Sequence, residues 1–239
     1  MRSRDAISRR FSEGSSVVGG YTAVIFDLDG TLLNTLDDLA DSVNYALTQY
    51  GLPARSTKEV CRFVGNGVRR LMTLAVPGGE AHEQFEEIFA CFKKRYYDNS
   101  VGKTRPYDGI EALLQRLREG GFAMAVVSNK FDAAVADLNQ RFFAQYIPVA
   151  IGERADLKRK PAPDMVLEAI RLLGKQKKEC VYIGDSEVDI ATAKNTGIDC
   201  ISVLWGFRDR AELEQNGAAC FAQTPEELAA LLTNCRAFE

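Results

Sequence analysis

Charged and polar residues gather in four short segments of the sequence. Three of them directly follow a run of apolar residues, and the fourth, at Lys160, lies at the end of a loop after such a run. Two aspartates, Asp27 and Asp29, are separated by a single residue, and Asp185 and Asp189 lie four residues apart. Alternate residues of an extended chain are spaced so that Asp27 and Asp29 can both approach one pocket. Carboxylates, a hydroxyl group and a lysine can supply a nucleophile, an acid, a base and an anion ligand. The four segments are Asp27-Leu28-Asp29-Gly30-Thr31, Ser128-Asn129-Lys130, Lys160-Pro161 and Gly184-Asp185-Ser186-Glu187-Val188-Asp189.

The apolar runs before these segments are typical of buried β-strands. The strands are expected at Tyr21–Phe26, Phe122–Val127, Val149–Ile151, Val181–Ile183 and Cys200–Leu204. Helical spacing of apolar residues predicts helices between them, at Ile110–Glu119, Asp132–Phe143, Met165–Leu173 and Glu187–Thr196. This alternation favours an α/β fold, a Rossmann-like three-layer core with a mainly parallel sheet. Such sheets carry their active sites at the carboxyl ends of the strands, where we expect the four segments to meet.

Residues 27–121 interrupt this alternation, because a βαβ unit needs only about 30 residues. They contain helical patterns but no convincing strand, with helices expected at Leu36–Tyr50, Ser56–Phe63, Gly67–Ala75 and Glu83–Asn99. We therefore predict a four-helix cap inserted after the first strand. The predicted divisions are a flexible tail over residues 1–20, an α/β core over 21–36 and 104–239, and a cap over 37–103.

The composition excludes several classes of protein. The formal net charge of −3 argues against a nucleic-acid partner, and no apolar run is long enough to span a membrane. The first twenty residues lack the apolar stretch of a secretory signal. None of the six cysteines forms a CxxC pair, which fits reduced thiols in a cytoplasmic protein. We expect a small-molecule substrate and a monomer or homodimer, and we expect the single histidine, His82, to be exposed rather than catalytic.

The stretches FDLDGTL, VVSNK, KRKPAPD and YIGDSEVDI resemble, in order and spacing, the four motifs of the haloacid dehalogenase (HAD) superfamily of phosphohydrolases. The resemblance covers the chain from Tyr21 to its C-terminus. It is strongest for the subgroup with a helical cap inserted after the first motif. Within that subgroup, FVGNGVRRLM and LWGFRD resemble the phosphoglycolate phosphatases. The resemblance implies a HAD-like core and hydrolysis of a phosphate ester.

The resemblance also implies roles for the paired aspartates. Asp27 would attack phosphorus to form an aspartyl-phosphate, which divides one displacement into two easier steps. Asp29 would protonate the leaving oxygen and then activate water. A turn or a helix cap is the alternative explanation for such a pair when it is taken alone. The dehalogenases of the superfamily lack the second aspartate, so Asp29 favours phosphoryl transfer.

Two carboxylates and a phosphate dianion in one site require a compensating cation. Mg²⁺ suits such a site, because it uses few carboxylates together with phosphate and water. By resemblance its ligands are Asp27, the main-chain carbonyl of Asp29, and Asp185. Asp189 would act outside the ligands, through water or by orienting Lys160, and an exposed position on a helix is the alternative for it.

The remaining segments are expected to hold the phosphoryl group. The Ser128 hydroxyl and the N–H of Asn129 would bind its oxygens, although Ser128 could instead be a helix N-cap. Lys160 would stabilise negative charge in the transition state. Thr31 would support the loop or contact phosphate, and we expect Lys130 to belong to the scaffold.

Substrate specificity is expected to come from the cap. The loop of Gly65, Asn66 and Gly67 permits a tight turn, and a helix beginning near Gly67 would present N–H groups to an anion. Arg69 or Arg70 could then bind a carboxylate, the alternative being that both are solvated.

These expectations lead to a Mg²⁺-dependent phosphatase acting on a small phosphorylated metabolite, with 2-phosphoglycolate as the first candidate. Three alternatives remain open on the same scaffold. They are a pyrophosphatase or nucleotidase, a phosphosugar mutase resembling β-phosphoglucomutase, and a non-catalytic protein that binds a phosphorylated metabolite.

Overall fold

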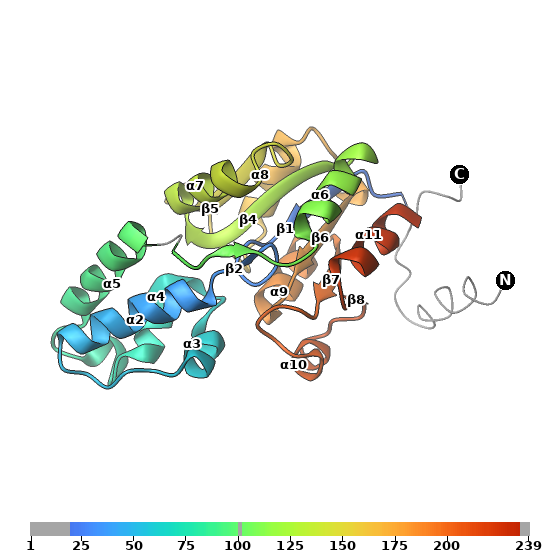
Figure 1. Cartoon of the computed structure of the whole chain (residues 1–239). Helices are drawn as coiled ribbons and strands as arrows, with labels where there is room; N and C mark the ends of the chain where they lie inside the picture. Colours follow the sequence, from blue (N-terminus) through green and yellow to red (C-terminus); the bar gives the residue numbers. More distant parts are fainter. Residues whose placement is uncertain (1–19, 100–101, 235–239) are drawn as a thin grey trace.

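The computed structural model describes residues 20–99 and 102–234 of the chain. The tail predicted over residues 1–20 lies, apart from Gly20, outside the described residues. Figure 1 shows an α/β body with a group of helices at one end, joined to the body by two adjacent stretches of chain. None of the helices in the described part of the chain is long and apolar enough to cross a membrane.

The body is built on a six-stranded sheet in the order β5-β4-β1-β6-β7-β8. Every neighbouring pair in this sheet is parallel, which confirms the predicted fold class. β1 lies between β4 and β6, so the segments that follow these three strands emerge side by side. The strands are β1 (Ala23–Phe26), β4 (Ala123–Phe131), β5 (Val149–Glu153), β6 (Cys180–Gly184), β7 (Asp199–Val203) and β8 (Phe221–Ala222).

Helices cover both faces of the sheet. Alternate residues of β1 enter two different cores: Val24 and Phe26 join one, and Ala23 and Ile25 join the other. The first core includes side chains of α6 (Ile110–Glu119), α7 (Asp132–Phe142) and α11 (Pro225–Asn234), and the second includes those of α8 (Asp164–Leu172) and α9 (Glu187–Thr196). Because both faces are covered, β1 is apolar at every position. The body also contains η3 (Lys177–Glu179) and α10 (Arg210–Gln215).

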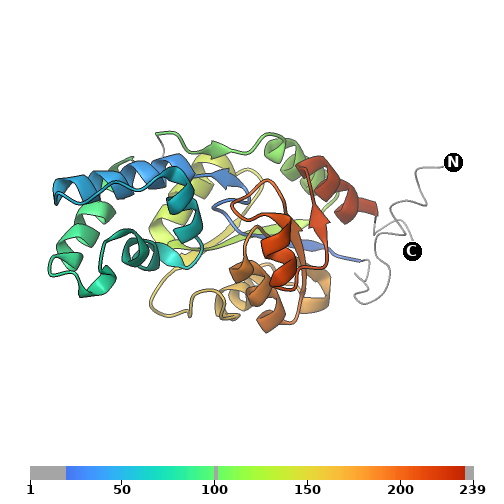
Figure 2. The ribbon, with the colours of Figure 1, turned by 90° about the horizontal axis from the view of Figure 1, so that it is seen from below.

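The helical group at the end of the body has a core of its own. Its buried side chains come from all four helices, and Figure 2 shows these helices set apart from the sheet. The helices are α2 (Leu36–Gln49), α3 (Thr57–Phe63), α4 (Gly67–Ala75) and α5 (Phe85–Asn99), with the short η2 (Gly79–Ala81) between the last two. This separate core supports our proposal that residues 37–103 form a cap.

A two-stranded antiparallel ribbon joins the helical group to the body. Its strands, β2 (Leu33–Asn34) and β3 (Arg105–Pro106), are the two stretches on which the chain leaves the body and returns. The buried carboxylate of Asp38 accepts hydrogen bonds from the N–H groups of Lys103 and Thr104 (2.7–3.0 Å), so the start of α2 is tied to the returning chain.

Candidate active site

The four polar segments meet at the carboxyl ends of β1, β4 and β6, around a cavity of about 50 Å³. Asp27 and Asp185 directly follow β1 and β6. Ser128, Asn129 and Lys130 lie within β4, near its carboxyl end. Residues of the helical group line the other side of the cavity. Its lining residues are Asp27, Asp29, Leu39, Val64, Gly65, Gly67, Val68, Leu71, Ser128, Asn129, Lys130, Lys160, Asp185, Ser186, Phe207 and Arg208.

Lys160 lines this cavity and lies between two carboxylates. Its Nζ donates to Asp27 Oδ1 at 2.7 Å and to Asp189 Oδ1 at 2.8 Å, and it lies 3.0 Å from the Tyr182 hydroxyl. Burial disfavours the ammonium charge, but the carboxylates of Asp189 and Asp27 more than offset this effect. The pKa of Lys160 therefore lies well above its usual value. A permanently charged lysine in contact with Asp27 is suited to stabilise an anion bound there.

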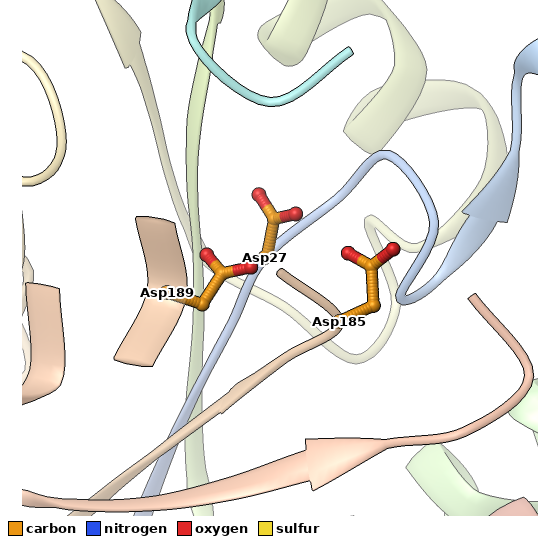
Figure 3. Close-up of side chains that lie close together, drawn as sticks. All are labelled: Asp27, Asp185 and Asp189. Atoms are coloured by element: carbon orange, nitrogen blue, oxygen red, sulfur yellow. The ribbon is translucent and has the colours of Figure 1, made fainter. Parts of the chain in front are cut away.

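Three buried carboxylates, those of Asp27, Asp185 and Asp189, lie close together (Figure 3). One oxygen from each lies within 4.8 Å of the others, so the group could hold a metal ion. Burial raises the pKa of Asp27 well above its usual value, although Lys160 opposes this, and burial together with Asp189 raises that of Asp185 to about 7. A divalent cation would relieve this crowding of negative charge.

The three carboxylates differ in how far the protein already satisfies them. Asp189 accepts hydrogen bonds on both oxygens, from Lys160 and Tyr182 on one and from the N–H and hydroxyl of Ser186 on the other. It is completely buried, so the alternative of an exposed helix position is wrong. Its contacts fit the orientation of Lys160 better than direct metal binding. Asp27 and Asp185 are thus the better candidates for metal ligands.

Asp185 is held in place by two neighbouring loops, those of Thr31 and of Gly206-Phe207. Its Oδ2 accepts from the N–H of Phe207 at 2.7 Å, and its Oδ1 accepts weakly from the Thr31 hydroxyl at 3.3 Å. Gly206 packs against the side chain so closely that a Cβ there would lie 2.3 Å from Asp185 Cβ. Thr31 therefore supports the loop and contacts a predicted metal ligand, and the glycine allows the close approach.

The segment at the end of β4 contacts Asp29. The Lys130 ammonium donates to Asp29 Oδ1 at 2.6 Å, and the Ser128 hydroxyl lies 3.4 Å from Oδ2. β4 continues to Phe131, which is the N-cap of α7, so the alternative that Ser128 is an N-cap is wrong. The Asn129 amide donates to the main-chain carbonyls of Gly65 and Lys160, which joins the cap loop to the body.

The structure brings only part of the predicted cap loop to the cavity. Gly65 and Gly67 line it, and α4 begins at Gly67 as expected. The side chain of Asn66 is exposed and does not line the cavity. The Arg69 guanidinium lies outside the cavity and forms ion pairs with Glu80 and Glu86, so its predicted contact with substrate is not supported. Glu80 belongs to η2 and Glu86 to α5, and neither residue lines the cavity.

Sequence reasoning missed Arg208, which joins the cap to the body. Its guanidinium donates to the carbonyls of Cys61 (3.1 Å) and Val64 (2.8 Å) at the end of α3, and its Nε donates to Glu187 of α9 at 3.0 Å. Arg208 also lines the cavity. Cys61 and Val64 are far from Arg208 in sequence, so no local pattern predicts this contact. The LWGFRD stretch contains Arg208, but it indicated only a resemblance of this segment to the phosphoglycolate phosphatases.

Replacing Arg208 with Met is expected to loosen the cap loop. The substitution removes charge-assisted hydrogen bonds, each of which contributes roughly 1.5–3 kcal/mol. We expect amide hydrogen exchange over residues 61–67 to accelerate by about 10-fold or more, with α6 unchanged. Arg210→Met, which removes an exposed arginine paired with Glu214, is the matched control. Unchanged exchange over residues 61–67 would show that Arg208 does not restrain the loop.

Several known proteins are similar to this chain. A family model described as haloacid dehalogenase-like hydrolase matches residues 24–203. A phosphoglycolate phosphatase of Mesorhizobium japonicum is 34% identical over 191 residues, which cover 78% of this chain and 84% of that protein. A plasmid-encoded phosphoglycolate phosphatase of Cupriavidus necator is 32% identical over 218 residues, covering 90% and 94%.

A solved structure has the same fold. It is that of a candidate phosphoglycolate phosphatase from Lactobacillus delbrueckii subsp. bulgaricus, which superposes with a TM-score of 0.85 at 36% sequence identity. The match covers 89% of this chain and 98% of that one. The likeness therefore includes both the sheet and the helical group.

Proposed function

This chain belongs to the haloacid dehalogenase-like hydrolases and is a phosphoric monoester hydrolase, and on that premise we propose that it hydrolyses 2-phosphoglycolate with the help of Mg²⁺. The observation that carries the proposal is the position of Asp27. Asp27 lines a small cavity, and its carboxylate is in contact with the Lys160 ammonium and near Asp185. The second carboxylate of its segment, Asp29, lines the same cavity.

We propose that Asp27 is the nucleophile and that Asp29 is the acid and base. An oxygen of Asp27 forms a bond to phosphorus while the bond to the leaving oxygen breaks, and Asp29 gives that oxygen a proton. Water then attacks phosphorus, gives a proton to Asp29 and releases the Asp27 carboxylate. Lys160 stabilises the charge on the phosphoryl oxygens, and Ser128 and the N–H of Asn129 bind them.

Mg²⁺ would be held by Asp27 and Asp185, with the main-chain carbonyl of Asp29 as the further ligand that the resemblance implies. The raised pKa values of both carboxylates fit a site that gains from a cation. When bound, the ion would neutralise charge between the phosphate and the nucleophile.

The size of the cavity favours a small substrate. A volume of about 50 Å³ corresponds to a few water-sized molecules, as one water needs roughly 10–15 Å³. A small phosphate ester suits this space better than a nucleotide. The names of the Mesorhizobium and Cupriavidus relatives point to 2-phosphoglycolate.

A phosphate-release assay of the purified protein with Mg²⁺ tests the proposal. The substrates are 2-phosphoglycolate, pyrophosphate, a hexose phosphate and a nucleoside monophosphate. We expect 2-phosphoglycolate to have the highest kcat/KM and activity to disappear with a chelator. A higher kcat/KM for one of the other substrates would contradict the substrate assignment, and an isomerised sugar phosphate without free phosphate would indicate a mutase.

A further inference from the structure

Lys130 is a buried lysine whose position is not explained by the reaction steps above. Its side chain is only 2% exposed, at the end of β4 and at the edge of the cavity. A buried ammonium is destabilising by several kcal/mol unless it is paired and hydrogen-bonded. For Lys130, the ion pair with Asp29 offsets this cost. The pairing suggests that Lys130 has a role connected with the Asp29 carboxylate.

The contacts of Lys130 fix the orientation of Asp29. Lys130 Nζ lies 2.6 Å from Asp29 Oδ1, while the Ser128 hydroxyl approaches Oδ2 at 3.4 Å. The N–H of Lys130 in turn donates to the Ser128 hydroxyl at 3.2 Å. Asp29 is thus held by the end of β4 rather than by its own loop, and its side chain remains 13% exposed toward the cavity.

The cap helix α5 covers the other side of the ammonium. Lys130 Nζ lies 4.8 Å from the ring centroid of Tyr96, which is itself buried. The next residue, Tyr97, stacks on Phe131 at 5.6 Å between ring centroids, so α5 is seated on the end of β4. A cation over an aromatic face is stabilised when water is excluded. Burial raises the pKa of Tyr96 to about 12, so its ring faces Lys130 as a neutral phenol.

We propose that Lys130 is a positioning residue that holds Asp29 as the base for hydrolysis of the aspartyl-phosphate, with Tyr96 of the cap sealing the ion pair. This inference rests on the proposed function. In that step a water oxygen bonds to phosphorus and the bond from phosphorus to the Asp27 oxygen breaks. One proton of the water passes to Asp29, which donates it to the leaving oxygen of the next substrate. Lys130 keeps its own proton throughout.

Acetyl phosphate allows the hydrolysis step to be observed separately. Its acetate leaving group needs no proton, so formation of the aspartyl-phosphate does not depend on Asp29, whereas its hydrolysis does. In Lys130→Met, we expect the phosphorylated enzyme to accumulate and to decay about 10- to 100-fold more slowly than in the wild type, the effect of a misplaced catalytic group. Acid quenching followed by mass spectrometry of the intact protein measures both quantities.

The controls separate this role from a general loss of structure. Lys158→Met removes an exposed lysine and is expected to leave the decay unchanged. If Lys130→Met does not fold, Lys130→Gln is measured instead, because it loses the charge but retains a hydrogen-bond donor, placed one atom closer to the main chain. Slowed decay in the variant that folds supports the proposal.

Two results would overturn the proposal: decay at the wild-type rate, or equal losses in formation and decay without accumulation. A wild-type protein that neither becomes phosphorylated nor releases phosphate would instead contradict the proposed function. Wild-type turnover together with unchanged decay in the Lys130 variant would overturn only the role of Lys130.

Discussion

Asp27→Asn is expected to lower kcat for phosphate release by at least about 10³-fold. An amide oxygen is a far weaker nucleophile than a carboxylate, and loss of the nucleophile in another well-studied hydrolase costs about 10⁶-fold. The side chains have nearly the same size, and the amide can keep an oxygen toward Lys160. The substitution also removes one negative charge from the crowded carboxylates, so we expect the variant to fold and to be at least as stable as the wild type.

The measurement is steady-state phosphate release, with thermal unfolding as the test of folding. Asp137→Asn changes an exposed aspartate of α7 in the same way and is the matched control. Activity retained in a folded Asp27→Asn protein would contradict the assignment of the nucleophile.

Lys160→Met is expected to have two large effects. The first is a loss of kcat of about 10²- to 10³-fold, because the charge that stabilises the phosphoryl oxygens disappears. The second is a loss of stability of about 3 kcal/mol or more, because Asp27 and Asp189 are left buried together without their common cation. Urea unfolding and phosphate release measure the two effects separately.

The double variant Lys160→Met with Asp189→Asn distinguishes these effects. Removing the charge of Asp189 relieves the repulsion, so we expect part of the stability to return while activity stays low. Lys158→Met, an exposed lysine of the same loop, is the control for both measurements. Recovery of activity along with stability would mean that Lys160 acts only through folding.

The sheet was predictable because its strands bury both faces. β1 and β6 are apolar at nearly every position, and such runs are visible in the sequence. The edge strand β8 and the ribbon strands β2 and β3 have two residues each, too few to show a period. Their pairing depends on chain segments that are distant in sequence, and they could not be predicted from local pattern.

The same distinction applies to the candidate site. Asp27, Lys160 and Asp185 meet because they follow strands whose order in the sheet can be anticipated for this fold. The partners of Arg69 could not be anticipated, since they depend on how η2 and α5 pack beside α4. The position of Lys130 beside Asp29 depends on β4 continuing past Val127, where its register with β5 changes. A polar stretch such as Ser128-Asn129-Lys130 is typical of a loop. The sequence therefore predicts that the strand ends at Val127, whereas β4 continues to Phe131.

Identification of the phosphorylated residue tests the account most directly. The wild-type protein is mixed with 2-phosphoglycolate and Mg²⁺, quenched in acid and reduced with borohydride, which converts an aspartyl-phosphate to homoserine. Peptide mass spectrometry then locates the homoserine. We predict homoserine at position 27, dependent on both substrate and Mg²⁺. Its formation at another aspartate, or its absence under conditions that trap the phosphorylated protein during turnover, would contradict the proposed mechanism.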